Sequence, residues 1–452
     1  MYMDLRCAMM SKISSEQEGK IMTIREEAQR MKLVSPEMAA APIAMRNDAL
    51  ERMARALEDG KEEIFAANEK DLAAAKEAGV SPAIQKRLRY DETKMRDSIA
   101  GLRELITLPD PVGKILLARE LDEGLVLTRV SVPIGVIGVI FEARPDAMVQ
   151  VASLCVKSGN CAILKGGKET ANTNAVIFEK LKKAVLDARL PEGCLFQATA
   201  HSEIDELLAC DREVDLLIPR GSNRFVRYIM DHTKIPVMGH SSGICHIYVD
   251  EKADQKMAIP VIVDAKTQYP AACNAVETVL ISRKIAGAFL PVLAKALTER
   301  GVKLRGTEEV ARCLAGTAPV EVMGEDDFAT EYNDLVISLK LVEDVKEAVD
   351  HINRFGSHHT DSILTEDDAA AEYFLQRVDS AGVYRNCSTR FADGYRYGFG
   401  AEVGISTGKL HARGPVGLEG LVTYKYKLVG NGQIVGDYAS GKKQFHHKDL
   451  KI

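Results

Sequence analysis

The chain of 452 residues is too long for a single ordinary hydrophobic core, so two or three domains are expected. Its composition, 46% hydrophobic and 27% charged, is that of a globular protein, and no apolar run is long enough to span a bilayer. The formal net charge is -6 and the basic residues are scattered, which argues against a nucleic-acid surface and favours small-molecule ligands.

The nine cysteines form no Cys-x-x-Cys pair, and no secretory signal precedes them. These features predict free thiols in a reducing compartment, the cytoplasm. Residues 1–20 are interpreted as a flexible extension. The histidine pairs His358-His359 and His446-His447 lack carboxylate or thiol companions at the spacing of a zinc site, so no metal is expected.

The N-terminal part of the chain, residues 23–107, has apolar positions three and four apart among Ala, Glu, Lys and Arg. This spacing predicts amphipathic helices. Between residues 121 and 140 the pattern changes to β-branched residues with period-two stretches, and the Pro-Ile-Gly at 133–135 supplies a bend. That stretch predicts a strand pair or a long ribbon.

From residue 146 apolar strands alternate with helices as far as the strand CHIYVD at 245–250, and a second alternating block follows Cys273. Repeated strand–helix units predict parallel, doubly wound sheets in two α/β domains, with Cys273 at their junction. After Arg390 the chain becomes glycine-rich and ends in a predicted strand, LVTYKYKLVG, and a polar tail.

The end of the strand CAILK is a candidate binding site, because ligands of open parallel sheets lie at the carboxyl ends of the strands. Lys165, Gly166, Gly167 and Lys168 follow one another here. The glycines permit close approach of a ligand and the lysines offer two cations. A tight turn with solvated lysines accounts for the same residues.

The strand VDLLIPR ends at Gly221 and Ser222, which open a predicted helix. The free amides of that helix suit a phosphate, or the serine is a simple helix cap. No G-x-G-x-x-G sequence follows any strand, so the ordinary dinucleotide-binding motif is absent.

The segment KTQYPAACNAVET places the thiol of Cys273 after two alanines, with no histidine near it in the sequence. A cysteine in such surroundings is either a small buried hydrophobe or a nucleophile. Its position where two domains meet favours the nucleophile, and the amide of the neighbouring Asn274 suits an oxyanion.

Several long motifs are specific: PIGVIGVIFEARPD, AILKGGKE, LIPRGSN, GICHIYVD, AKTQYPAACNAVET, NCSTRFADG, and GFGAEVGIST followed by KLHARGPVGLEG. With these motifs in order, residues 25–450 resemble the aldehyde dehydrogenase superfamily. The resemblance implies an α/β, aldehyde dehydrogenase-like fold of two doubly wound parallel-sheet domains plus a β-arm for oligomerisation. It assigns ranges as follows: residues 21–118 and 142–266 to an NADPH-binding domain, 267–413 to a catalytic domain, and 119–141 with 414–452 to the arm and tail.

Within the superfamily the motifs resemble those of reductases that act on acyl phosphates. This implies NADPH-dependent reduction of L-glutamyl 5-phosphate to L-glutamate 5-semialdehyde and phosphate through a thioester on Cys273, the second step of proline biosynthesis from glutamate. The thiolate would be activated by backbone amides and by the electrostatics of the cofactor, without a histidine. A homodimer or larger homo-oligomer is expected, supplied with substrate by a separate glutamate 5-kinase.

Two other activities remain open on the residues alone. An NAD-dependent hydrolytic aldehyde dehydrogenase needs a glutamate base, and the corresponding stretch here, VMGHSSGICHIYVD, contains no acid before Asp250. A cofactor-free cysteine amidase or transferase needs a Cys–His pair, for which His240 and His246 are the nearest candidates at a strand end.

The resemblance also implies roles for three further residues. Arg144 stands where aldehyde-oxidising relatives place an oxyanion-binding asparagine, and its forked guanidinium suits a leaving phosphate. A surface ion pair with Glu142 or Asp146 accounts equally for Arg144. Glu331 falls where the superfamily places the glutamate that holds the nicotinamide ribose. Lys168 stands where NAD-using relatives often carry a glutamate, which predicts a preference for NADPH.

Four residues of NCSTRF are assigned to the amino-acid head of the substrate: Asn386, Ser388, Thr389 and Arg390. An α-carboxylate needs a cation, which Arg390 supplies, unless this arginine braces the glycine-rich loop that follows. Arg385 and Cys387 depart from the small residues usual in related reductases, which leaves the shape of the substrate pocket open.

Overall fold

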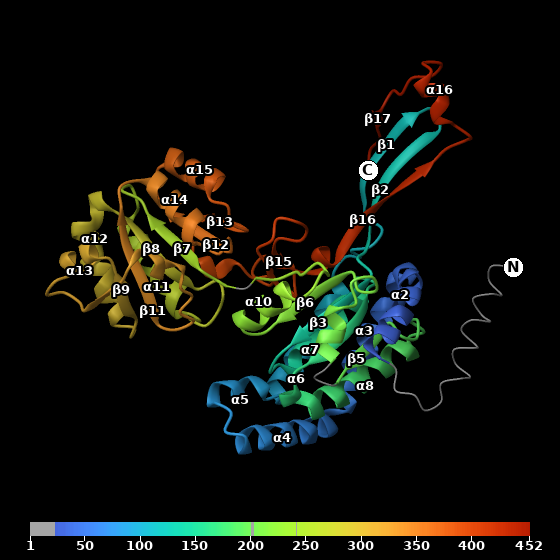
Figure 1. Ribbon diagram of the computed structural model, residues 1–452, viewed down its shortest axis with the longest axis horizontal. Helices are drawn as coiled ribbons and strands as arrows, with labels where there is room; N and C mark the ends of the chain where they lie inside the picture. The colour runs from blue at the N-terminus through green and yellow to red at the C-terminus, as the bar shows by residue number, and fades with distance from the viewer. Residues whose placement is uncertain (1–22, 200–202, 241) are drawn as a thin grey trace.

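The computed structural model describes residues 23–199, 203–240 and 242–452. Figure 1 shows two α/β units joined through a connecting segment, with a long β-arm that projects away from the first unit. The predicted extension at residues 1–20 lies outside the described residues. Among the described helices, none is long and apolar enough to cross a membrane.

The first unit is built on a four-stranded parallel sheet in the order β5-β4-β3-β6. Its strands are β3 (Val136–Phe141), β4 (Cys161–Gly166), β5 (Leu195–Ala198) and β6 (Leu216–Arg220). Its helices are α2 (Ile24–Ala40), α3 (Ile43–Asp59), α4 (Lys61–Glu77), α5 (Pro82–Leu88), α6 (Glu92–Thr107), α7 (Pro145–Lys157), η1 (Lys168–Thr170), α8 (Ala171–Asp187), α9 (Glu203–Leu208) and α10 (Asn223–Asp231). The helical prediction for residues 23–107 is confirmed: Leu50, Met53 and Leu57 are buried at helical spacing along α3, which packs against α6 and α8.

The second unit contains a seven-stranded, all-parallel sheet in the order β10-β9-β11-β8-β7-β12-β13. Its strands are β7 (Cys245–Val249), β8 (Val276–Ser282), β9 (Lys303–Gly306), β10 (Val320–Val322), β11 (Val336–Val342), β12 (Thr360–Leu364) and β13 (Gly382–Arg385). Its helices are α11 (Gln255–Thr267), α12 (Arg283–Thr298), α13 (Glu308–Cys313), η2 (Glu325–Ala329), α14 (Val345–Phe355) and α15 (Asp368–Arg377). Every residue of β7, β8 and β12 is buried, as expected for central strands with helices on both faces.

The arm is a four-stranded antiparallel sheet in the order β16-β2-β1-β17. Its elements are β1 (Ile115–Asp122), β2 (Leu125–Pro133), β16 (Val422–Val429), α16 (Val435–Ala439) and β17 (Lys448–Asp449). Four short elements lead to it from the second unit: η3 (Thr389–Phe391), β14 (Gly404–Ser406), β15 (Gly414–Val416) and η4 (Leu418–Leu421). The predicted pairing of the ribbon with the C-terminal strand is therefore present.

Two strands lie in a different sheet from the one that the predicted ranges imply. β7 falls in the range 142–266 but pairs with β8 and β12 of the second sheet. β3 falls in the range 119–141 assigned to the arm but forms the centre of the first sheet. Both errors have one cause: alternation of strands and helices identifies a strand, whereas its sheet is decided by long-range pairing.

Candidate active site

Cys273 lies in the turn between α11 and β8, at the amino end of the second sheet, and is partly exposed. The backbone of Gly243 runs against it so closely that a side chain at position 243 would collide with the main chain of Cys273. This contact requires a glycine. The approach of these two segments fixes the position of the thiol relative to the start of β7.

A histidine contacts the thiol, contrary to the prediction. Nε2 of His359 lies 3.2 Å from Sγ of Cys273, although the two residues are 86 positions apart. Nδ1 of His359 lies 3.0 Å from Oγ1 of Thr360, and this contact holds the ring with Nε2 toward the sulfur. If Nδ1 carries the proton and donates it to the threonine, Nε2 is left free to accept a proton from the thiol.

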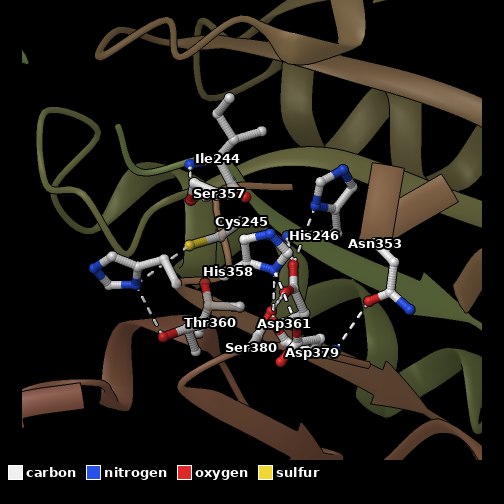
Figure 2. Close-up of polar contacts among 12 residues, drawn as sticks. Ile244, Cys245, His246, Asn353, Ser357, His358, Thr360, Asp361, Asp379 and Ser380 are labelled. Carbon is white, nitrogen blue, oxygen red and sulfur yellow. Dashed lines mark hydrogen bonds and ion pairs between the residues drawn. The ribbon is translucent and has the colours of Figure 1, made fainter. Parts of the chain in front are cut away.

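The neighbouring histidine at the start of β7 serves a different purpose. His246 is fully buried, and its Nδ1 lies 3.1 Å from Oδ1 of Asp361, which also accepts the His246 backbone N–H at 2.7 Å. Figure 2 shows His246 turned toward Asp361, with Ser380 donating to the other carboxylate oxygen at 2.5 Å. His246 is therefore a structural residue, and its candidacy as the partner of Cys273 is wrong.

A second imidazole stands beside His359. The rings of His240 and His359 have centroids 5.1 Å apart and are nearly perpendicular. Nδ1 of His240 donates to the carbonyl of Ile405 at 2.7 Å, and burial lowers the pKa of His240. His240 was a predicted candidate for the partner of Cys273. It lies at the site, beside His359, which makes the contact with the sulfur.

Two arginines bring positive charge to the thiol, and a third lies close to one of them. Burial lowers the pKa of Arg220, at the end of β6; the nearby Arg144 lowers it further, whereas the charge of Cys273 raises it. Burial also lowers the pKa of Arg390, again opposed by Cys273. Nε of Arg390 donates to Oε1 of Gln268 at 2.9 Å, so its guanidinium is held next to the segment that carries the thiol. Arg144 and Arg390 were predicted, whereas Arg220 was not.

Glu142 and Asp146, the two carboxylates considered as surface ion-pair partners of Arg144, have other partners. Glu142 accepts the backbone N–H of Ser222 at 3.2 Å, and Asp146 lies 3.6 Å from Nζ of Lys94. Arg144 is exposed at the first position before α7. Its guanidinium is thus exposed, close enough to Arg220 to lower the pKa of that residue.

Of the predicted residues in the segment after β13, Thr389 lies close to the thiol segment, whereas Asn386 lies at the opposite edge of the sheet. Thr389 is buried and donates to the carbonyl of Asn274 at 2.7 Å, and Ser388 caps η3 by accepting the Arg390 N–H at 3.3 Å. Asn386 instead accepts the Thr365 N–H at 2.9 Å, at the carboxyl end of β12. The amino end of β12 carries His359, so Asn386 lies away from the thiol.

Asn274 supports the loop. Its Nδ2 donates to the carbonyl of Ala392 at 2.8 Å, and the side chain is only 4% exposed. That bond uses one of the two N–H groups of the amide, and the use of the other for an oxyanion stays a prediction. Of the two unusual residues of the motif, Arg385 lies at the carboxyl end of β13 and pairs with Asp368 at 2.7 Å, and burial raises the pKa of Cys387.

The end of β4 is close to the predicted arrangement. Lys165 is 4% exposed, its Nζ donates to the carbonyl of Gly166 at 2.8 Å, and burial lowers its pKa. Lys168 begins η1 and is exposed. A side chain at Gly166 would collide with Asn174, and one at Gly167 would collide with Glu169.

The end of β6 faces the second unit. Ser222 caps α10 by accepting the Phe225 N–H at 3.4 Å, and a side chain at Gly221 would collide with Glu142. Nδ2 of Asn223, the first residue of α10, donates to Oε2 of Glu331, which precedes β11 at the amino edge of the second sheet. The carboxyl edge of the first sheet and the amino edge of the second therefore face each other across the site.

Three features of the site were missed in the sequence, each for a local reason. His359 was considered only as part of a histidine pair, and its place directly before a strand was the available signal. Arg220 is the last residue of a strand whose end had already been singled out. Glu402 lies in a glycine-rich stretch that gave no periodic signal. Burial raises the pKa of Glu402 to about 7, and its charge raises the pKa values of both Arg220 and His240.

These features define an enzyme with a cysteine nucleophile set between two parallel α/β units. The sequence comparisons agree: the model of the aldehyde dehydrogenase family matches residues 7–310. A gamma-glutamyl phosphate reductase from Pelotomaculum thermopropionicum is 52% identical over 429 residues, which cover 95% of this chain and 98% of that protein. One from Acetivibrio thermocellus is 51% identical over 95% of this chain and 99% of its own length.

Solved structures give the same assignment. The crystal structure of a gamma-glutamyl phosphate reductase from Thermotoga maritima is 39% identical, covers 90% of this chain and 99% of its own, and superposes with a TM-score of 0.88. The chain therefore belongs to the aldehyde dehydrogenase family, and within it to the gamma-glutamyl phosphate reductases.

Proposed function

We propose that the protein reduces L-glutamyl 5-phosphate to L-glutamate 5-semialdehyde and phosphate, with NADPH as the reductant, in proline biosynthesis from glutamate. The observation that carries the proposal is a partly exposed thiol in contact with an imidazole and close enough to the guanidinium groups of Arg220 and Arg390 to affect their pKa values. An acyl phosphate needs a nucleophile at its carbonyl and cations at its leaving group, and this arrangement offers both.

The first step is attack of Sγ of Cys273 on the γ-carbonyl carbon. The thiol proton passes to Nε2 of His359, 3.2 Å away, because the thiolate is the nucleophilic form. As the C–O bond to phosphate breaks, a thioester forms on Cys273 and phosphate leaves with the bonding electron pair. His359 then returns its proton to the sulfur when the aldehyde is released.

Arg144 and Arg220 are proposed to hold the phosphate. They lie at the ends of two adjacent strands of the first sheet, close enough for the charge of Arg144 to lower the pKa of Arg220. Two cations held this close repel each other, and a phosphate dianion between them relieves that repulsion. Arg390, buried beside Gln268, is proposed to bind the α-carboxylate of the substrate, with Ser388 and Thr389 shaping its loop.

Enzymes of the aldehyde dehydrogenase family use a nicotinamide cofactor, which supplies the hydride that reduces the thioester. The residues at the strand ends fit such a group. Oδ1 of Asn174 beside Gly166 is buried and accepts no hydrogen bond within the described part of the chain, so it is available to a donor. Lys165 and Lys168 are proposed to meet the anionic part of the cofactor and to favour NADPH, and Glu331 to hold a ribose hydroxyl. Gly221 and Ser222 precede α10, where a phosphate group is proposed to take the place of the Glu142 carboxylate on the Ser222 N–H.

The test is the reverse reaction with L-glutamate 5-semialdehyde and NADP. If phosphate is the natural acceptor of the acyl group, NADPH formation stops after one turnover in phosphate-free buffer and resumes when phosphate is added. Continued turnover without phosphate would instead support the hydrolytic alternative. In that event Glu402 is the carboxylate to replace, since a pKa near 7 suits a general base.

A homo-oligomer in the cytoplasm is also proposed. The arm leaves apolar side chains exposed along β16, among them Tyr426 at 57% and Leu428 at 56%, and a second copy would cover them. The eight described cysteines are free, which agrees with a reducing compartment. Sedimentation of the purified protein as a monomer at micromolar concentration would contradict the oligomer. The substrate is proposed to come from a separate glutamate 5-kinase.

A further inference from the structure

Cys273, His240 and His359 present a set of metal-ligating atoms that the reductase reaction does not require as a set. One ligand atom from each of the three lies within 4.8 Å of the other two. They come from three separate segments: the loop before β7, the turn before β8 and the residue before β12. The fold therefore brings one sulfur and two imidazole nitrogens together.

The second nitrogen of each ring is already anchored. Nδ1 of His240 donates to the carbonyl of Ile405 at 2.7 Å, which leaves the lone pair of the neutral ring on Nε2. Nδ1 of His359 is anchored by Thr360 at 3.0 Å, with Nε2 toward the sulfur. Histidines that bind metals are held in this way, with one nitrogen fixed by a carbonyl or hydroxyl and the other directed to the ion.

We propose that these three residues form a Zn²⁺ site, and that bound Zn²⁺ inhibits the enzyme reversibly by occupying its nucleophile. One thiolate and two imidazoles are ligands that Zn²⁺ prefers, whereas Mg²⁺ and Ca²⁺ require oxygen. Binding releases the Cys273 proton to solvent and forms a Zn–S bond, so no oxidant or reductant is needed. The partly exposed thiol leaves a fourth position for water.

The distances support a site that closes on the ion. With Zn–S near 2.3 Å and Zn–N near 2.0 Å, tetrahedral ligands lie roughly 3.3–3.6 Å apart. The Cys273–His359 distance of 3.2 Å already matches, and His240 moves inward by roughly 1.5 Å at most from the 4.8 Å limit. Such a shift is small for a side chain in a loop.

The charged side chains around the site affect how tightly Zn²⁺ is expected to bind. Arg220 and Arg390 oppose a cation, whereas Glu331 and Glu402 raise the pKa of His240 and so act in its favour. Because the two arginines repel a cation, we expect weaker binding than that of a structural zinc site, which suits reversible inhibition.

The experiment titrates chelator-treated protein with Co²⁺ and with Zn²⁺. Co²⁺ reports its ligands by absorption: we expect one equivalent to give the thiolate charge-transfer band in the near ultraviolet and the visible bands of a tetrahedral ion. Zn²⁺ should displace it, protect Cys273 from iodoacetamide, and be removed by EDTA with return of the free thiol. These readouts need no reductase turnover, so they remain informative if the proposed substrate is wrong.

The variants His240→Gln, His359→Gln and Cys273→Ser should each weaken Co²⁺ binding by tenfold or more, and the last should abolish the charge-transfer band. His358→Gln is the matched control: His358 adjoins His359 in sequence, but its Nδ1 lies against the Asp379 carbonyl at 2.6 Å. A Co²⁺ spectrum without the thiolate band, or equal affinity in all four variants, would overturn the proposal. Because the Cys273→Ser change is nearly isosteric, it remains decisive if a histidine variant fails to fold.

Discussion

The two sheet edges that face each other across the site differ in construction. The carboxyl edge of the first sheet is made of strand ends rich in glycine, with Lys168 exposed and carboxylates resting on backbone N–H groups: Glu142 on Ser222 at 3.2 Å and Glu169 on Ala143 at 2.6 Å. The amino edge of the second sheet is made of buried side chains, of which His246 and Asp361 are fully covered. One edge is open and the other is rigid.

This difference assigns a separate task to each edge. Reacting groups need fixed geometry, which the buried hydrogen bonds around His359 and Thr389 provide. A dissociable cofactor needs backbone N–H groups that it can bind and release. An edge of glycines, where carboxylates occupy those N–H groups when the cofactor is absent, meets that need. The two parallel units in tandem thus place the carboxyl edge of one sheet against the amino edge of the next.

The largest effect is expected on the rigid edge, at the nucleophile. Cys273→Ala should lower turnover by roughly 10⁴-fold or more while NADPH binding stays near that of the parent, because no thioester forms without the thiol. Steady-state kinetics and cofactor fluorescence measure the two quantities. Cys245→Ala is the matched control, since Cys245 also lies near His359, at 3.8 Å, but its burial raises its pKa well above the ordinary value. Near-normal turnover in Cys273→Ala would end the thioester mechanism.

His359→Gln comes next. Gln retains a hydrogen-bonding group but accepts no proton near neutral pH, so kcat/KM at pH 7 should fall by about 10²-fold. The rate of Cys273 alkylation by iodoacetamide should fall with it, and both should recover as pH rises and the thiol ionises by itself. His358→Gln serves as the control. If alkylation is unchanged at pH 7, His359 packs against the sulfur without activating it.

On the open edge, Lys168→Glu tests cofactor choice. Loss of a charge-assisted bond to a 2′-phosphate costs about 2 kcal/mol, so the Michaelis constant for NADPH should rise roughly thirtyfold while that for NADH changes much less. Kinetics with both cofactors at low ionic strength give the ratio. Lys182→Glu, an exposed lysine about three turns along α8, controls for net charge. A ratio of efficiencies equal to the parent's would remove Lys168 from cofactor selection.

The smallest effect concerns the free energy of unfolding of the second unit, which carries the rigid edge. Burial lowers the pKa of His351 to about 2, assisted by the charges of His246, Lys340 and Arg354. Because the folded state keeps this ring neutral while the unfolded chain protonates it near pH 6.5, stability is lost as pH falls below 6.5, by up to about 1.4 kcal/mol per pH unit.

His351→Asn should therefore flatten the acid side of the stability curve, so that the loss between pH 6.5 and 5.5 shrinks by about 1 kcal/mol. Urea unfolding at the two pH values measures it, and the exposed His447 supplies the control variant His447→Asn. An equally steep loss in His351→Asn would assign the acid sensitivity to other groups.

The sequence by itself determined the kinds of element and several chemical residues. Apolar spacing and strand–helix alternation are local patterns, so they predicted the helices of residues 23–107 and both parallel sheets, whereas the arm was expected from the family resemblance. The strand-end rule predicted a binding role for Lys165, Lys168 and Ser222, which lie on the carboxyl edge of the first sheet, where the rule applies. The position of Cys273 between two alternating blocks identified the thiol.

Only the tertiary structure decided which strands share a sheet and which side chains meet at the sulfur. β7 was assigned to the wrong part, since its pairing with β12 joins residues more than a hundred positions apart and leaves no local pattern. β3 was assigned to the arm, although it pairs with β4 and β6. His359 was missed because it lies on an amino edge, where ligands of a single sheet do not bind. It reaches Cys273 only because β12 and β8 both flank β7 in the same sheet and start at the same edge, next to the first unit.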